Sequence, residues 1–275
     1  MNSRKVLFTA ISIACVLAII AAIWAEIDLK NGASKIEKNR TKAQVEIKTQ
    51  EDLKKDFNNM FNNSIDFKNY DESSITKYDN SKELVYSAFD MENREENKYE
   101  IDLHIPVINI KNEVGEKFNN ITQEVFANKA NEIFKEVKAY TIYSVTYTGY
   151  INDDILSVII KSTLKEGNSA QRVIVQTYNY NLKTNKEVSL QDIIEQKNIE
   201  KSKVEAKIKT EVTKAIKETN KIQASGYETY SRDFNSDIYN FDNISTFFLN
   251  NEGKLYIIFA YGNNNFTAEM DIIEI

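Results

Sequence analysis

The chain has 275 residues, of which 42% are hydrophobic and 28% are charged, and this composition is typical of a folded protein rather than a disordered or fibrous one. One Cys and one His exclude a disulfide scaffold and a zinc site built from Cys and His ligands. The 35 Lys and Arg against 41 Asp and Glu give a net charge of −6, the wrong sign for a nucleic-acid-binding protein, so no nucleic-acid partner is expected.

The N-terminal 25 residues have the pattern of a transmembrane signal anchor. Arg4 and Lys5 precede an uncharged apolar run over residues 6–25, and Glu26 ends it. A helix of this length spans about 30 Å, the thickness of the hydrocarbon core of a bilayer. Positive charge before the run and acid after it predict a single-pass protein of the cell membrane. Residues 1–5 are then a cytoplasmic tail, and the main domain is extracytoplasmic.

Two other interpretations of this segment compete with a retained anchor. A cleaved signal peptide cut after Ala25 would have Ile23 at position −3, where a small residue is preferred. A lipoprotein would use Cys15, but the apolar run continues well beyond this cysteine. We therefore favour the anchor, in which Cys15 is an apolar residue of the membrane helix.

Residues 26–82 are predicted to form a stalk that contains one short amphipathic helix. Residues 28–50 are polar and rich in Lys, and residues 62–82 are rich in Asn, Asp and Ser, which is typical of a loop. Thr49 as N-cap and Asp52 as its capping-box acid predict a helix between these segments. Its apolar face consists of Leu53, Phe57, Met60 and Phe61.

A folded domain is predicted for residues 83–275. Strands are expected at 84–89 and 99–105, joined by a long hairpin loop over 91–98, and Pro106 marks a strand end or an edge. Residues 113–137 have the helical period, with an apolar stripe of Val114, Phe118, Ile121, Val125, Ile133, Phe134 and Val137. Three strands follow at about 140–150, 154–164 and 170–182, and their short links require antiparallel neighbours.

The rest of the chain predicts two more helices and three more strands. Leu190, Ile193 and Ile194 indicate a short helix, and Ser202 with Glu205 is a capping box for a second one. Residues 221–243 have no clean period. A hairpin over 244–249 and 255–261 and a last strand over 267–275 complete the predicted elements. They predict an α+β fold with a mostly antiparallel sheet and two or three packed helices on one face.

The residues with catalytic chemistry form no recognisable active site. His104 lies in the strand 99–105 on the face opposite Ile101, Leu103 and Ile105, and no Cys or second His accompanies it. No phosphate-binding loop, dinucleotide fingerprint or Gly-x-Ser-x-Gly elbow occurs. We therefore expect a protein that is not an enzyme, with no catalytic residues, metal ligands or cofactor. A hydrolase that uses carboxylates is the alternative.

Aromatic residues in the irregular segments are better candidates for a function, because Tyr and Arg on loops are typical of surfaces that bind proteins or glycans. In the alternative interpretation, the same rings only hold a long loop against the domain. The predicted binding residues are Tyr227, Tyr230, Arg232, Tyr239, Tyr261 and Phe266.

Several strand and turn motifs resemble a bacterial extracytoplasmic domain family of unknown function. They comprise Tyr178–Lys186 with Leu190–Ile194, Tyr99–Ile110 with its Ile105-Pro106, and Phe247–Leu249 followed by Leu255–Tyr261. The family is shared by sigma-V anti-sigma factors, which bind lysozyme, and by the non-catalytic N-terminal part of some peptidoglycan deacetylases. The resemblance covers residues 83–275. It concerns structural motifs, so it implies a fold more strongly than an activity.

The resemblance implies a binding or sensing domain of the cell envelope, with a lysozyme-type muramidase or the cell-wall glycan peptidoglycan as partner. Without Arg4 and Lys5, the extracytoplasmic part has 33 basic against 41 acidic residues, a net charge of −8 that attracts cationic proteins. The alternative is a regulatory relative of an anti-sigma factor that acts through membrane-proximal proteolysis, which predicts a shed ectodomain after envelope stress.

Overall fold

The computed structural model of the chain describes residues 48–66, 70–262 and 267–275, and contacts between them group Gln50–Ile275 into one unit. The predicted membrane span over residues 6–25 and most of the predicted stalk lie outside the described residues. Among the helices of the described ranges, none is long and apolar enough to cross a membrane.

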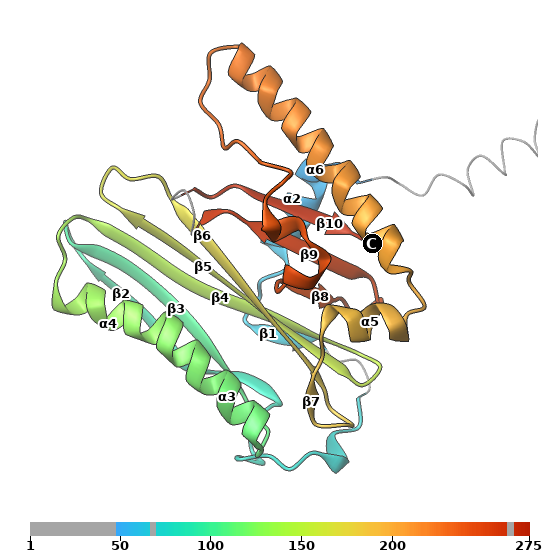
Figure 1. Ribbon diagram of the computed structural model, residues 1–275. Coiled ribbons are helices and arrows are strands. Elements are labelled where there is room, and N and C mark those ends of the chain that lie inside the picture. The colour runs from blue at the N-terminus through green and yellow to red at the C-terminus, as the bar shows by residue number, and fades with distance from the viewer. Residues whose placement is uncertain (1–47, 67–69, 263–266) are drawn as a thin grey trace, which may run out of the picture. The chain divides into compact units, whose positions relative to one another are not determined.

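The larger sheet has the strand order β2-β3-β4-β5-β6-β7, and β1 also pairs with β4 (Figure 1). The predicted antiparallel meander is confirmed as β4, β5 and β6. Two pairs are parallel, β3 with β4 and β1 with β4, so the sheet is mixed. Its strands are β1 (Ser64–Asp66), β2 (Val85–Glu95), β3 (Tyr99–Ile108), β4 (Thr141–Asn152), β5 (Ile155–Glu166), β6 (Arg172–Asn181) and β7 (Lys186–Glu187).

The hairpin of β2 and β3 is confirmed, but its loop is much shorter than predicted. Strand β2 continues to Glu95, and Asn97 makes the turn with a φ of 61°. The predicted loop over 91–98 is therefore wrong, because a charged edge strand has the same composition as a loop. Pro106 lies inside β3 opposite Ser87, beside a β-bulge, where a missing N–H is tolerated.

One long helix connects β3 to β4 and covers one face of the larger sheet (Figure 1). It consists of α3 (Glu113–Thr122), the π-helical segment η2 (Gln123–Ala127) and α4 (Asn128–Lys135). This crossover allows β3 and β4 to be parallel neighbours, which a tight hairpin cannot do. The core beneath it includes Phe118, Phe126, Ala130, Ile133, Ile101, Leu103, Ile105, Tyr143, Val145, Tyr147, Val158 and Ile160.

The π-helical segment changes which side chains face this core. Ile121 and Val125, both in the predicted apolar stripe, are 40% and 36% exposed, whereas Thr122 and Phe126 are buried. A π-helical turn contains more residues than an α-helical one, so positions four apart stay on the same face. The predicted stripe is therefore wrong at these two positions.

The predicted C-terminal hairpin and last strand are confirmed, but they form a second sheet of their own. Its antiparallel order is β10-β9-β8, from β8 (Phe247–Leu249), β9 (Leu255–Ala260) and β10 (Met270–Glu274). It packs on the face of the larger sheet opposite α3 and α4. The contact consists of Ile159, Val173 and Val175 from the larger sheet and Phe248, Ile258, Met270 and Ile272 from the smaller one.

A buried polar link joins the two sheets. Ser157 Oγ of β5 donates to Asn179 Oδ1 of β6 over 2.6 Å. Asn179 Nδ2 donates to the carbonyl of Phe247 over 2.8 Å, and the N–H of Leu249 donates to Ser157 Oγ over 3.2 Å. These bonds attach β8, which has only three residues, to the strands beneath it.

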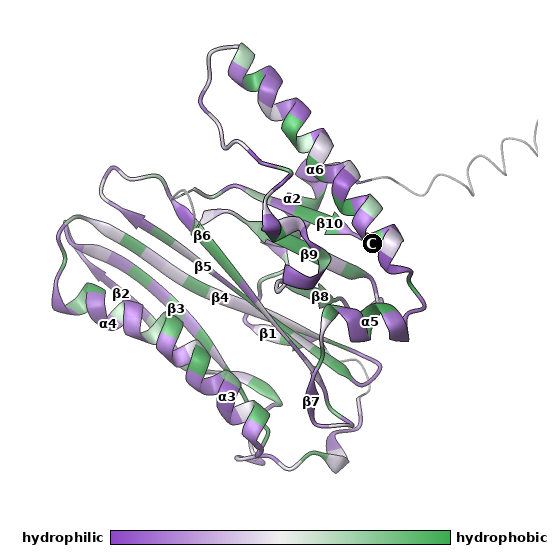
Figure 2. Cartoon of the chain, viewed as in Figure 1, coloured by the Kyte–Doolittle hydropathy of each residue, from purple (hydrophilic) through white to green (hydrophobic). Residues whose placement is uncertain are grey.

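Helices α5 (Leu190–Gln196) and α6 (Lys201–Ala224) cover the outer face of the smaller sheet. The unit is therefore layered as helix, sheet, sheet and helix, with most hydrophobic residues in the strands and many polar ones on α6 (Figure 2). The predicted α+β class is confirmed. The prediction that the helices share one face is wrong, because the second sheet separates them.

The N-terminal ends of α5 and α6 differ from each other. Ser189 and Asp192 form a complete capping box for α5. The predicted box of Ser202 and Glu205 is wrong, because α6 begins at Lys201 and its N-cap, Glu200, makes no capping bond through its side chain. Both predicted residues lie in the helix itself, where their side chains are exposed.

Residues 50–66, which the sequence assigned to the stalk, lie inside the folded unit. The predicted helix is present as α2 (Gln50–Asn59), and its Leu53 and Phe57 are buried between the two sheets. Strand β1 pairs with β4, and η1 (Glu72–Ser74) lies between β1 and β2. The folded unit therefore begins about 30 residues before the predicted boundary at residue 83, because the apolar face of α2 is buried by strands far away in sequence.

Candidate functional site

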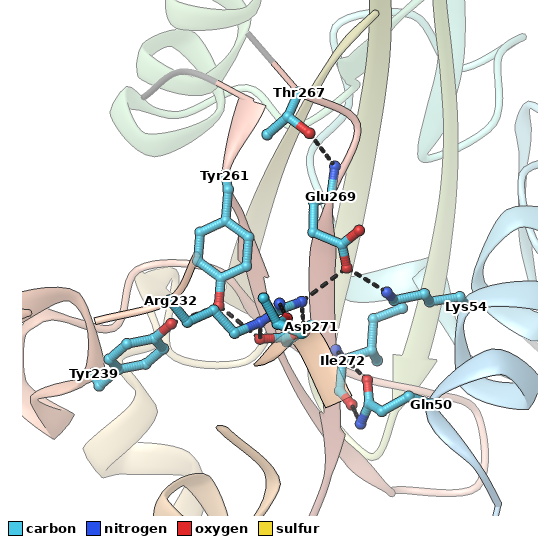
Figure 3. A network of polar contacts seen from close by, with 10 residues as sticks. Gln50, Lys54, Arg232, Tyr239, Tyr261, Thr267, Glu269, Asp271 and Ile272 are labelled. Carbon is cyan, nitrogen blue, oxygen red and sulfur yellow. Dashed lines mark hydrogen bonds and ion pairs between the residues drawn. The ribbon is translucent and has the colours of Figure 1, made fainter. Parts of the chain in front are cut away.

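The irregular segment after α6 returns to the two sheets through two short 3-10 helices, η3 (Asp237–Tyr239) and η4 (Phe241–Asn243). Four of the six predicted binding residues meet here. Arg232 and Tyr261 bond to Asp271 of β10, and Tyr239 bonds to Tyr261 (Figure 3). Tyr230 stacks on Tyr261, with ring centroids 4.3 Å apart.

Arg232 is the centre of this network. Its Nε donates to Asp271 Oδ2 over 2.6 Å, and its Nη2 donates to Asp271 Oδ1 over 2.7 Å and to Glu269 Oε1 over 2.8 Å. Its Nη1 donates to Thr219 Oγ1 of α6 over 3.0 Å. The side chains of Arg232 and Asp271 are only 4% and 3% exposed. A bidentate pair of this kind compensates the loss of hydration of both charges.

Two buried tyrosines extend the network. Tyr261 OH donates to Asp271 Oδ2 over 2.7 Å, so the hydroxyl of Tyr239, 2.7 Å away, donates to the Tyr261 oxygen. Burial raises the pKa of Tyr261, and the charge of Asp271 raises it further. Burial also raises the pKa of Tyr239 to about 12. Tyr239 is 7% exposed and Tyr261 is 1% exposed, and both rings hold the segment against β9 and β10.

Glu269 connects the network to helix α2. Its Oε1 accepts from Lys54 Nζ over 2.6 Å as well as from Arg232. One turn earlier, Gln50 Nε2 donates to the carbonyl of Ile272 over 2.8 Å, and the N–H of Ile272 donates to Gln50 Oε1 over 3.2 Å. The amide of Gln50 therefore pairs with β10 as a neighbouring strand would. The segment after α6 and helix α2 share the carboxylate of Glu269 (Figure 3).

The variant Glu269→Gln is expected to lose less of its free energy of unfolding at acid pH than the wild type does. Burial by itself would raise the pKa of Glu269, but Lys54 and Arg232 outweigh it, so the pKa lies below its ordinary value. A carboxyl group of this kind stabilises the fold above its unfolded pKa, about 4.3, and the stabilisation is lost as the pH falls through the folded pKa. Urea unfolding between pH 7 and 3 should give a shallower slope below about pH 4.5 for the variant. The exposed Glu228→Gln is the control, and equal slopes for the wild type and Glu269→Gln would contradict the expectation.

An open groove of about 670 Å³ lies between α6 and the segment that the network holds. Its volume is in the range of small-molecule sites. The α6 wall exposes the small side chain of Ala206, which leaves room for the groove. The lining residues are Ser202, Glu205, Ala206, Ile208 and Lys209 from α6 and Phe234, Tyr239, Asn240, Phe241, Asp242 and Asn243 from the following segment.

The remaining predicted binding residues lie apart from the groove or outside the description. Tyr227 is 70% exposed just beyond the end of α6, and it does not line the groove. Phe266 lies outside the described residues. The sequence prediction chose Tyr239 but missed Phe234, Lys209 and the two Asn residues of the groove. The spacing of Ser202, Glu205 and Lys209 along one face of α6 was the available signal.

His104 lies where the sequence placed it, on the face of β3 opposite the core. Its Nδ1 is 2.7 Å from Asp90 Oδ1, and its Nε2 is 3.2 Å from Asp102 Oδ1. Both carboxylates are exposed. Across the described residues, no group of three or more His, Cys, Asp or Glu side chains has the arrangement of a metal site.

No protein-family model and no curated protein sequence matches the chain. Solved structures that are similar to it include the following two. A DUF3298 family protein from Pseudomonas aeruginosa PAO1 has 12% identity and a TM-score of 0.40, and the match covers 70% of this chain and 88% of that one. A member of the same family from Bacteroides fragilis NCTC 9343 has 11% identity and a TM-score of 0.35, with 64% and 80% covered. Both similar structures are of the DUF3298 family, which is shared by sigma-V anti-sigma factors and the N-terminal part of some peptidoglycan deacetylases and is the family that the sequence motifs resemble.

Proposed function

We propose that this chain is a non-catalytic, membrane-anchored binding or sensing domain of the bacterial cell envelope. Its ligand is peptidoglycan or a lysozyme-type muramidase. Residues 6–25 anchor it, and the folded unit from Gln50 onward lies outside the membrane. The observation that supports binding most directly is the open groove beside a segment that a buried ion-pair network holds in place.

The network supports binding because it fixes one wall of the groove before a ligand arrives. Arg232, Tyr239 and Tyr261 are held by bonds of 2.6 to 3.0 Å to buried or partly buried partners. A wall that is already ordered has little conformational entropy to lose, and this improves the affinity for a given contact area.

The same network supports a non-catalytic role. Asp271 and Glu269 are at least partly buried, and both are paired with Arg232. Glu269 is paired with Lys54 as well. Lys54 and Arg232 outweigh the burial of Glu269 and hold its pKa below the ordinary value, whereas a general acid needs a raised pKa.

The net charge supports a muramidase as the alternative to the glycan. An extracytoplasmic part with a net charge of −8 attracts a cationic enzyme at long range and accelerates its association. Such attraction is screened by salt, with a Debye length of about 10 Å at 0.1 M. Salt dependence therefore distinguishes this partner from an uncharged sugar.

Binding by the full-length chain in detergent micelles tests the proposed function. We expect it to co-sediment with purified peptidoglycan sacculi, or to bind a C-type lysozyme in calorimetry with a Kd below about 1 μM, equivalent to about −8 kcal/mol. Lysozyme binding should weaken between 50 and 300 mM salt, whereas sacculus binding should not. Absence of both would contradict the proposal. Release of soluble fragments from the sacculi would contradict its non-catalytic part.

A further inference from the structure

We propose that the groove between α6 and η4 binds the N-acetylated amino sugars of a glycan strand. This inference rests on the proposed function and names the ligand of the groove. Three features of the lining support it: an exposed aromatic ring, polar side chains that can accept and donate hydrogen bonds, and a balance of charge.

The exposed ring is that of Phe234, which is 37% exposed and lines the groove. It stacks on Tyr239 with an interplanar angle of 11° and centroids 6.1 Å apart. Tyr239 is in turn held through the hydroxyl of buried Tyr261. Because the Phe234 ring is stacked on Tyr239, it offers apolar contact area at a low entropic cost. The C–H face of a pyranose ring is a flat apolar surface that can stack on such a ring.

Two amide side chains of the groove each use one N–H group of the nitrogen for a bond within the segment. Asn240 Nδ2 donates to Asp237 Oδ1 over 3.1 Å, and Asn243 Nδ2 donates to the carbonyl of Asp237 over 2.9 Å. Their Oδ1 atoms and their second N–H groups can bond to a ligand, and the lining also offers the carboxylate of Glu205 and the hydroxyl of Ser202. A lining that offers both acceptors and donors suits a ligand whose groups can do both, such as the hydroxyl and acetamido groups of an amino sugar.

The charges of the groove balance. Lys201 Nζ is 2.8 Å from Asp242 Oδ1 and lies over the Phe241 ring, so this pair is neutral at one end of the groove. Lys201 does not itself line the groove, but it neutralises Asp242, which does; of the other lining residues, Glu205 is negative and Lys209 is positive. A groove without net charge has little attraction for a polyanion or for the cationic surface of a muramidase. An uncharged, acetylated sugar is the envelope ligand that matches it.

The replacement Ala206→Trp tests the inference by filling the groove from the α6 wall. Ala206 is exposed, so the larger side chain should not disturb the core. The matched control is Ala224→Trp, also exposed on α6, 18 residues further along the same face and about 27 Å away. Phe234→Ala is a second variant that removes the exposed ring without filling the groove.

The probe is the tetramer of N-acetylglucosamine, titrated into the full-length chain in detergent by calorimetry. We expect at least tenfold weaker binding for Ala206→Trp and for Phe234→Ala, and unchanged binding for Ala224→Trp. The tetramer of glucose, which lacks the acetamido groups, should bind at least tenfold more weakly than the acetylated one.

Three outcomes would overturn the inference and leave the proposed function in place. They are equal affinity of wild type and Ala206→Trp for the probe, equal affinity of wild type for the two tetramers, and binding of sacculi or lysozyme without binding of the probe. If wild type binds none of the probe, sacculi and lysozyme, the proposed function itself fails.

Discussion

The replacement Arg232→Met is expected to lower the free energy of unfolding by about 3–5 kcal/mol, the usual cost of removing one partner of a buried ion pair. Asp271 would remain buried, with only the hydroxyl of Tyr261 as hydrogen-bond donor among the contacts described above. The methionine fills part of the volume of the arginine stem, so the loss reflects charge rather than a cavity. Urea unfolding followed by circular dichroism at pH 7 measures it.

A double-mutant cycle provides the control for this expectation. If the cost comes from an uncompensated carboxylate, then Arg232→Met combined with Asp271→Leu should be less destabilised than the sum of the two single variants, by more than about 1 kcal/mol. Additive effects would show that Arg232 acts through its other partners, Glu269 and Thr219. Arg232→Lys should recover only part of the stability, because an ammonium cannot pair with a carboxylate in bidentate geometry.

The replacement Asn179→Leu is expected to cost about 2–4 kcal/mol, because it leaves the carbonyl of Phe247 and the hydroxyl of Ser157 without their partners in the interior. The effect should concentrate on β8. Amide hydrogen exchange of Leu249, whose N–H bonds to Ser157 Oγ, should accelerate more than that of β5.

Asn220→Leu is the matched control, because Asn220 is exposed on α6. A surface change of this kind should alter the stability by no more than about 0.5 kcal/mol. If the two Leu variants had the same stability, the link between the sheets would contribute nothing to the fold.

Local sequence patterns determined most of the secondary structure. Helix α2, the helix after β3, α5 and α6, and the strands of the meander and the C-terminal hairpin all lie where apolar periodicity predicted them. The reason is that each of these elements must bury one face, so its apolar residues repeat with its own geometric period. The same patterns determined the α+β class, and they placed His104 on the face of β3 away from the core.

The tertiary structure decided what the local patterns leave undetermined. The hydropathy pattern of β8, β9 and β10 would be the same if they extended the larger sheet or formed a second one. Their packing against Ile159 and Val175 shows that they form a second sheet. The apolar face of α2 likewise does not show whether another part of the fold buries it. The predicted stalk therefore extended beyond the point where the folded unit begins. The inward residues of the helix after β3 depended on the π-helical segment.

The candidate site shows most clearly which features local sequence determines and which depend on tertiary contacts. The sequence determined that aromatic residues and Arg232 cluster in an irregular segment. The tertiary structure decided that Tyr239 and Tyr261 are buried and that Phe234 lines the groove with its ring partly exposed. The deciding residues are Asp271, 39 positions after Arg232, and Ala206, whose small side chain opens the groove. Burial depends on neighbours that are distant in sequence, and a local pattern contains no information about them.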